Sequence, residues 1–93
     1  MKIEFYGDTA FVTDLSIAAA VLCAANGDVV YEGLRPVDGH NGQLYFVLSG
    51  DVVHIRRIID MYQHGHLHID NAKAYASELR TLKKEVHAHG KSG

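Results

Sequence analysis

Residues 51–89 read DVVHIRRIIDMYQHGHLHIDNAKAYASELRTLKKEVHAH. The second half of this stretch has a clear helical pattern, because apolar residues recur every three or four positions, at Ala72, Tyr75, Leu79, Leu82 and Val86. Such spacing places the side chains on one stripe of a helix. We therefore predict a terminal helix that Asp70 or Asn71 caps and that packs its apolar stripe on the rest of the domain.

The first half of the stretch predicts another amphipathic helix. Its apolar positions are Val52, Ile55, Ile58, Ile59 and Tyr62. Ser49 or Asp51 is a suitable N-cap, and Gly65 is a suitable left-handed stop. Because only about half a dozen residues connect the two helices, we predict that they pack on each other as a C-terminal helical hairpin.

Basic side chains gather on the outer faces of both predicted helices. One interpretation is an ordinary solvated helix surface. The other is a surface that recognises phosphate or an acidic partner. The candidate partner-binding residues are Arg56, Arg57, Lys73, Arg80, Lys84 and His87.

The length and charge of the chain limit what it can be. Its 93 residues suggest one domain, over residues 1–89, with a loose tail over residues 90–93. The formal net charge of −2 argues against a strong overall attraction to nucleic acid. The charge is uneven, however: residues 1–50 contain two Lys and Arg against six Asp and Glu, and residues 51–93 contain seven against five. These counts permit a basic patch on an acidic body.

The cysteine content and the apolar runs bear on location. The one cysteine, Cys23, cannot form an internal disulfide. The start of the chain lacks the apolar block of a signal peptide. The longest apolar run, residues 17–25, is much shorter than the roughly 20 residues that cross a membrane. We therefore expect a cytoplasmic protein with no membrane partner.

The first half of the chain predicts strands over residues 2–6, 28–37 and 43–48. The last two are joined by DGHNG at residues 38–42, which is typical of a hairpin loop. Strict alternation in the second strand would place Tyr31 and Leu34 on opposite faces. Residues 10–12 lead into a helix over residues 14–25, capped by Thr13 or Asp14. The order strand, helix, strand, strand, helix, helix predicts an α+β domain with a small antiparallel sheet.

The helix at residues 14–25, DLSIAAAVLCAA, is apolar nearly all round. A helix without a polar face is either covered on all sides or exposes apolar surface to a partner. Full coverage is hard to arrange in so small a domain. We therefore expect this helix to contact a protein partner or to form a homodimer.

The connector between the last two helices has His64, His66, His68 and Asp70 at alternate positions. In an extended chain these side chains would point to one side, where imidazoles are plausible ligands for zinc or nickel. Gly65 interrupts this alternation, so a polar surface connector is the alternative interpretation. The metal hypothesis is zinc at His64, His66 and His68, and we expect no other cofactor.

Catalytic motifs are missing from the sequence. It contains no GxSxG, no Walker A loop and no HExxH. Its carboxylates lack the spacing of an acid/base pair, and His40 has no nucleophile close to it in the sequence. We expect a binding protein and not an enzyme.

Four segments carry a resemblance to a known family: FVTDLSIAAAVLCAANG, LYFVLSG, MYQHGHLHID and AYASELRTLKKEVH. Over residues 11–87 they are similar to a family of short uncharacterised prokaryotic and phage proteins. An aromatic–Thr–Asp lead into an Ala-rich helix, a following strand and a terminal helix with a Leu–Lys pair carry the similarity. The resemblance implies a phage or mobile-element origin, and it implies no catalytic residue.

The main functional hypothesis is a protein-interaction module that binds a host or phage protein through the basic face of the last two helices. By analogy with small phage proteins, the partner would be a host defence protein that is inhibited. One alternative is a nucleic-acid-binding accessory or regulatory protein. Its phosphate-contacting residues would be Arg56, Arg57, Lys73, Arg80, Lys83 and Lys84. Another is a His-rich metal-binding protein, or a protein that binds a small anionic ligand.

Overall fold

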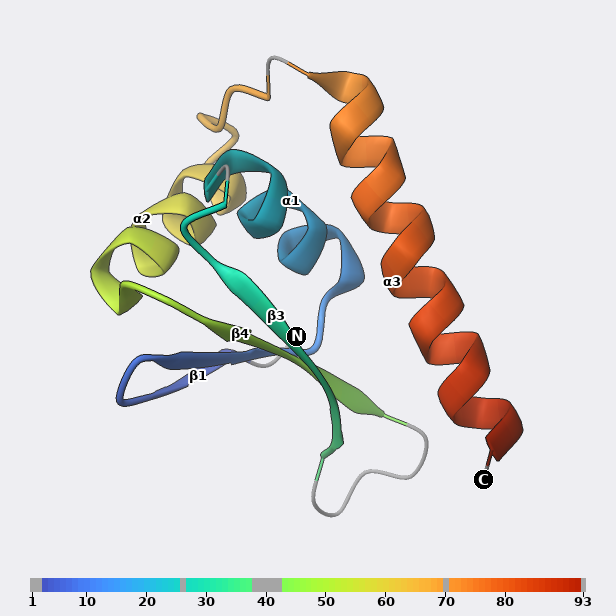
Figure 1. Ribbon diagram of the computed structural model, residues 1–93. Helices are drawn as coiled ribbons and strands as arrows, with labels where there is room; N and C mark the ends of the chain where they lie inside the picture. The colour runs from blue at the N-terminus through green and yellow to red at the C-terminus, as the bar shows by residue number, and fades with distance from the viewer. Residues whose placement is uncertain (1–2, 26, 38–42, 70, 93) are drawn as a thin grey trace.

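A computed structural model describes residues 3–25, 27–37, 43–69 and 71–92. Their elements are strands β1 (Ile3–Tyr6) and β2 (Thr9–Val12), helix α1 (Leu15–Ala25), strands β3 (Val30–Pro36) and β4 (Leu44–Ser49), and helices α2 (Val52–Gln63) and α3 (Ala72–Ser92). The strands form one antiparallel sheet in the order β1-β2-β4-β3. The helices lie on one side of it (Figure 1). The predicted α+β class with a small antiparallel sheet is confirmed.

The sheet contains β2, a strand that the sequence did not predict. Residues 10–12 were expected to lead into the helix, but β2 pairs with β1 on one side and with β4 on the other. Gly7, at φ +60°, takes the left-handed conformation that a tight turn from β1 requires. The strand contributes Ala10 and Val12, which are both fully buried.

β3 departs from strict alternation at a bulge between Tyr31 and Gly33, where its register with β4 shifts. An extra residue in one strand turns the following side chains to the other face. Tyr31 and Leu34 therefore both pack against the core, although alternation predicted opposite faces. Gly33, at φ +124°, supplies a backbone conformation that other residues rarely adopt.

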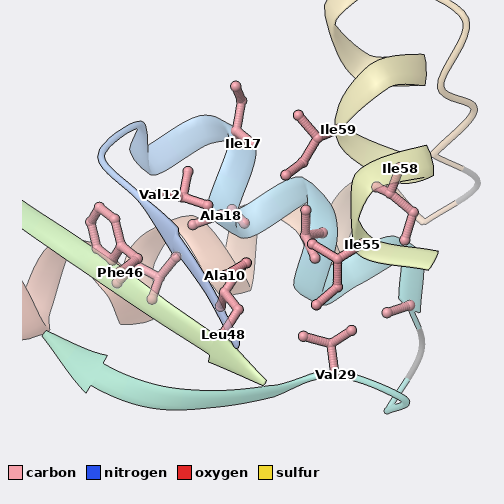
Figure 2. Packing of buried hydrophobic residues seen from close by; sticks show 14 residues of the cluster. Ala10, Val12, Ile17, Ala18, Val29, Phe46, Leu48, Ile55, Ile58 and Ile59 are labelled. Carbon is pink, nitrogen blue, oxygen red and sulfur yellow. The ribbon is translucent and has the colours of Figure 1, made fainter. Parts of the chain in front are cut away.

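α1 is the central element of the core. None of its residues is exposed, because the sheet, α2 and α3 surround it (Figure 1). Figure 2 shows Ala18 of α1 between the sheet residues Val12 and Leu48 and the α2 residue Ile55. We expected that covering this helix would be hard in so small a domain, but the domain leaves none of its residues exposed. Its apolar surface is used internally and gives no argument for a homodimer.

α2 and α3 do not pack on each other as the predicted hairpin. Each packs mainly on α1, from opposite sides (Figure 1). The physical reason is that α1 is apolar all round, so it can bury the apolar stripes of both helices at once. Tyr62 and Tyr75 approach each other near the connector, but beyond that point α1 separates the two helices.

The residues that cap the helices are among those predicted from the sequence. The side-chain oxygens Asp14 Oδ1, Asp51 Oδ1 and Asn71 Oδ1 each accept a backbone N–H of the first turn at 3.0 Å. Gly65, at φ +73°, follows the end of α2 as predicted.

α3 continues to Ser92, so residues 90–92, predicted as part of a loose tail, have a helical backbone. One glycine costs a helix only about 1 kcal/mol, so Gly90 does not end it. The predicted loop at residues 38–42, the Asp70 cap and Gly93 lie outside the described residues. Within the described ranges, no helix has both the length and the apolar character that a membrane crossing requires.

Candidate partner-binding surface

α3 is docked along its first half only. Leu82 is fully buried, and Tyr75 and Leu79 pack partly buried against the core. From Lys83 to His89 every side chain is exposed. Even Val86, the last residue of the apolar stripe, is 37% exposed. Figure 1 shows this second half of α3 running past α1. The apolar stripe therefore continues beyond the packed core.

A groove opens between the second half of α3 and the sheet, with a volume of about 290 Å³. We call it the α3 groove. Its apolar lining comes from three elements: Leu15 of α1, Leu44 and Phe46 of β4, and Val86 of α3. Its polar lining is Thr13, Gln43, Lys83 and His87. The α3 groove thus combines an apolar floor with a basic rim on α3.

A second groove of about 360 Å³ borders α3 over β3. It is lined by Tyr31, Gly33, Leu34, Glu85, Ala88 and His89. Helical spacing puts Glu85 and His89 on a different side of α3 from Lys83 and His87. The second half of α3 is therefore separated from the sheet along both of its sides.

The Tyr31 hydroxyl lies in this second groove. Tyr31 Oη is buried and has no hydrogen-bond partner among the residues described. Burial, and then the negative charge of Glu85, raise the pKa of Tyr31 above its usual 10.0. Glu85 is thus near enough to act on this hydroxyl through its charge, but no hydrogen bond joins the two in the described structure.

Two basic residues of α3, Lys83 and His87, line the α3 groove. Together with exposed basic residues on the solvent side of the helix they form a set of five, which we call the basic strip. They are Lys73, Arg80, Lys83, Lys84 and His87. Lys83 was predicted for the nucleic-acid alternative but not for the protein-binding set, because it lies one position off the helical strip. Its position at the edge of the α3 groove can be seen only in the folded structure.

The electrostatics of the basic strip are unusual for a solvated helix face. Arg80 has Ala76, Ser77, Lys83 and Lys84 three and four positions away, and no acidic residue. Within the described part of the chain no ion pair involves a strip residue. Like charges at this spacing destabilise a helix by about 0.2–0.5 kcal/mol per pair. The strip is therefore mutually repulsive and unneutralised in the isolated chain.

The predicted site residues on α2 are placed differently. The Arg56 guanidinium carbon lies 4.4 Å from the centroid of the Phe5 ring of β1, in a cation–π contact. Arg57 is exposed. Both have Asp60 within one helical turn. Because α1 separates α2 from α3, the structure does not join these two arginines to the basic strip.

The histidines of the connector are not gathered into a metal site. His64 Nδ1 lies 2.8 Å from the Asp60 carbonyl oxygen and 3.3 Å from its Oδ1. The His64 and His66 ring centroids are 6.4 Å apart. Over the described ranges no group of three or more His, Cys, Asp or Glu is placed to hold a metal. Zinc at His64, His66 and His68 stays a prediction, tested by a zinc-dependent rise in Tm that His66→Ala/His68→Ala removes.

The face of the sheet away from the helices carries an aromatic row. Phe11 makes edge contacts with Tyr6 and Tyr45, with ring centroids 5.6 Å apart in both pairs. The Tyr6 hydroxyl donates to Glu4 Oε1 at 3.2 Å, and the Tyr45 hydroxyl donates to Glu4 Oε2. The polar atoms of this row satisfy one another, so the row stabilises the sheet and does not mark a binding site.

Comparisons with protein-family models, with curated proteins and with solved structures give no match. The resemblance to short prokaryotic and phage proteins stays a prediction. Function is therefore argued from the residues of this chain.

Proposed function

We propose that this protein is a non-enzymatic interaction module whose basic strip binds an acidic surface of a partner protein. The observation that carries the proposal is that Arg80, Lys83 and Lys84 are exposed within about one turn of each other, with no acidic residue three or four positions from any of them. A face that serves solubility alone usually mixes charges of both signs. The repulsion along the strip is relieved when an acidic partner neutralises it.

An acidic protein fits the surroundings of the strip better than nucleic acid does. The strip borders the apolar α3 groove, and protein interfaces combine an apolar centre with a charged rim. Nucleic-acid binding depends mainly on phosphate contacts, which an apolar floor does not favour. The net charge of −2 also opposes a polyanion as partner. The aromatic row, whose rings are the kind that stack on bases, lies on the far face of the sheet from the strip.

The finer parts of the proposal rest on the sequence alone. They are a phage or mobile-element origin, a cytoplasmic setting and a host defence protein as the partner that is inhibited. A homodimer would need a surface other than α1, because α1 has no exposed residue. Arg56 and Arg57 are secondary in the proposal, since α1 lies between them and the strip.

Affinity capture from lysate of a candidate host tests the proposal. The tagged chain is compared with Arg80→Glu/Lys84→Glu and, as a matched charge reversal, with Arg57→Glu, each with and without nuclease. We expect a stoichiometric protein that survives nuclease, that the double variant loses and that Arg57→Glu retains. Retention by the double variant contradicts the strip. Loss on nuclease treatment favours nucleic acid, and an empty capture favours a small anionic ligand.

A further inference from the structure

We infer that the α3 groove holds one large apolar side chain of the partner, so that the partner segment is an apolar anchor flanked by acidic residues. The inference rests on the proposed function and deepens it, because it names the chemistry that the basic strip and the groove recognise together.

The shape of the α3 groove supports a side-chain anchor. Its volume of about 290 Å³ is at the lower end of the range for ligand pockets. The groove is open to solvent along its length, whereas a small-molecule pocket usually encloses most of its ligand. Leu44 and Phe46 form the floor from β4, and Val86 forms a wall from α3. Covering such apolar surface is favourable at about 25 cal/mol per Å².

The charge around the groove defines what flanks the anchor. Lys83 and His87 line it, and none of the described residues that line it is acidic. Arg80 and Lys84 continue the positive charge along the exposed side of α3. A partner side chain bound against Phe46 thus has basic side chains on one side only, the side that α3 forms. Acidic residues a few positions before or after the anchor would complement them.

The two sides of α3 differ, and the difference selects the side on which the partner lies. The second groove contains Glu85 and the unpartnered Tyr31 hydroxyl. The negative charge of Glu85 would repel an acidic segment there. The acidic partner therefore lies on the Lys83 side, over β4 and the start of α1.

The test is selection of a randomised peptide library, displayed on phage, against the immobilised full chain. We expect enriched peptides with a Leu, Ile, Phe or Trp that has Asp or Glu within four positions. Their Kd is then measured by fluorescence anisotropy for the wild type, for Val86→Trp, which fills the groove, and for Ser77→Trp. Ser77→Trp places the same bulk on an exposed part of α3 outside the groove. Thermal unfolding confirms that each variant is folded.

The expected result is that Val86→Trp weakens binding about ten-fold or more, whereas Ser77→Trp leaves it nearly unchanged. Replacing the anchor of the peptide by Ser should have the same effect as Val86→Trp. If the binding of the peptides depends on Arg80 and Lys84 but is not weakened by Val86→Trp, the groove inference is overturned and the proposed function stands. Enrichment of no peptide, or of peptides without acidic residues, would overturn both.

A second copy of the chain is the competing occupant, and sedimentation equilibrium separates it from a partner segment. A monomer is expected for the wild type and for both variants. A dimer that Val86→Trp dissociates would show that the groove is an interface between copies, and would overturn the inference.

Discussion

α2 and α3 are both amphipathic and both basic on their outer faces, but they are attached to the domain in different ways. α2 follows β4 after Gly50 and Asp51, buries Ile55, Ile58 and Ile59, and holds Arg56 over an aromatic ring of the sheet. α3 follows a longer connector and fully buries only Leu82. One helix is thus fixed along its whole length, and the other is fixed along one half.

The two helices also differ in whether acidic residues lie near their basic residues. The arginines of α2 have Asp60 within a turn, which is the pattern of an ordinary solvated face. The residues of the basic strip from Arg80 to His87 have only basic or neutral neighbours three and four positions away. The unneutralised charge is found on the helix that overhangs a groove. This coincidence is why the interaction surface is assigned to α3 and not to both helices.

The largest expected effect concerns the single fully buried side chain of α3. Leu82→Ala should lower the free energy of unfolding by about 2–5 kcal/mol, because it removes buried methyl groups and leaves a cavity between α3 and α1. Val86→Ala, at a 37% exposed position, should cost less than about 1 kcal/mol. Urea unfolding measures both. Equal losses would mean that α3 is docked along its whole length.

The entry into α2 gives the next effect. A Cβ at Gly50, where φ is +155°, would lie 2.8 Å from the backbone oxygen of Asp28. Gly50→Ala should therefore cost about 2–3 kcal/mol in strain and displaced backbone. Gly65, at the start of the connector to α3, has nothing within 4 Å of such a Cβ. Gly65→Ala should cost about 1–2 kcal/mol from its positive φ alone.

If the two glycine substitutions destabilise the protein equally, the contrast between a tightly attached α2 and a loosely attached α3 does not hold. Chemical denaturation of both variants at one pH gives the comparison directly.

Much of the fold could be predicted because local patterns determine it. Helix periodicity, the caps at Asp14, Asp51 and Asn71, and the stop at Gly65 depend on residues close together in sequence. The strand β2 could not be predicted so easily. It has four residues, and Ala10 and Val12 become core residues only when β1 and β4 pair on either side of it.

The candidate site was predictable only in part. The basic residues of α3 could be recognised from helical spacing. We grouped them with Arg56 and Arg57 because helices joined by a short connector usually pack on each other. The position of α1 between them depends on long-range packing. The α3 groove, and Lys83 at its rim, likewise depend on which part of α3 reaches the core. The periodic pattern of apolar residues does not show which part of α3 contacts the core.

Reversing one charge on each helix should change stability in opposite directions. Arg80→Glu replaces repulsion from Lys83 and Lys84 by attraction, so it should raise the free energy of unfolding by about 0.4–1 kcal/mol. Arg57→Glu places a carboxylate one turn from Asp60 and should lower it by up to about 0.5 kcal/mol. Both effects should shrink at high ionic strength. Denaturation at low and high salt checks the signs.

A destabilising Arg80→Glu would contradict the view that the basic strip is unneutralised in the isolated chain. A gain in stability accompanied by lost partner binding would instead indicate that the strip is kept for recognition at a cost to the fold.

The last comparison concerns two tyrosine hydroxyls, one beneath each half of α3. Tyr75 Oη donates to the Ser16 carbonyl oxygen at 3.3 Å in the docked half, so Tyr75→Phe should cost about 1 kcal/mol. Tyr31 Oη lies under the overhanging half without a partner in the described structure. Tyr31→Phe should therefore change stability by less than about 0.5 kcal/mol at neutral pH. A loss near that of Tyr75→Phe would mean that Glu85 closes onto Tyr31 in solution.

The same two tyrosines should act alike in alkali. Burial, followed by Glu85 for Tyr31 and by Tyr62 for Tyr75, raises the pKa of each above its usual 10.0. Above that pH the unfolded chain loses its phenolic protons before the folded chain does, so stability falls as pH rises through the folded pKa. Below about pH 10 the contribution is complete. Tyr31→Phe and Tyr75→Phe should each flatten this alkaline fall, measured as the free energy of unfolding between pH 9 and 11. If Tyr31→Phe leaves the alkaline loss of stability unchanged, the Tyr31 hydroxyl is hydrated in solution. The second half of α3 would then lie farther from the sheet than the buried Tyr31 Oη indicates.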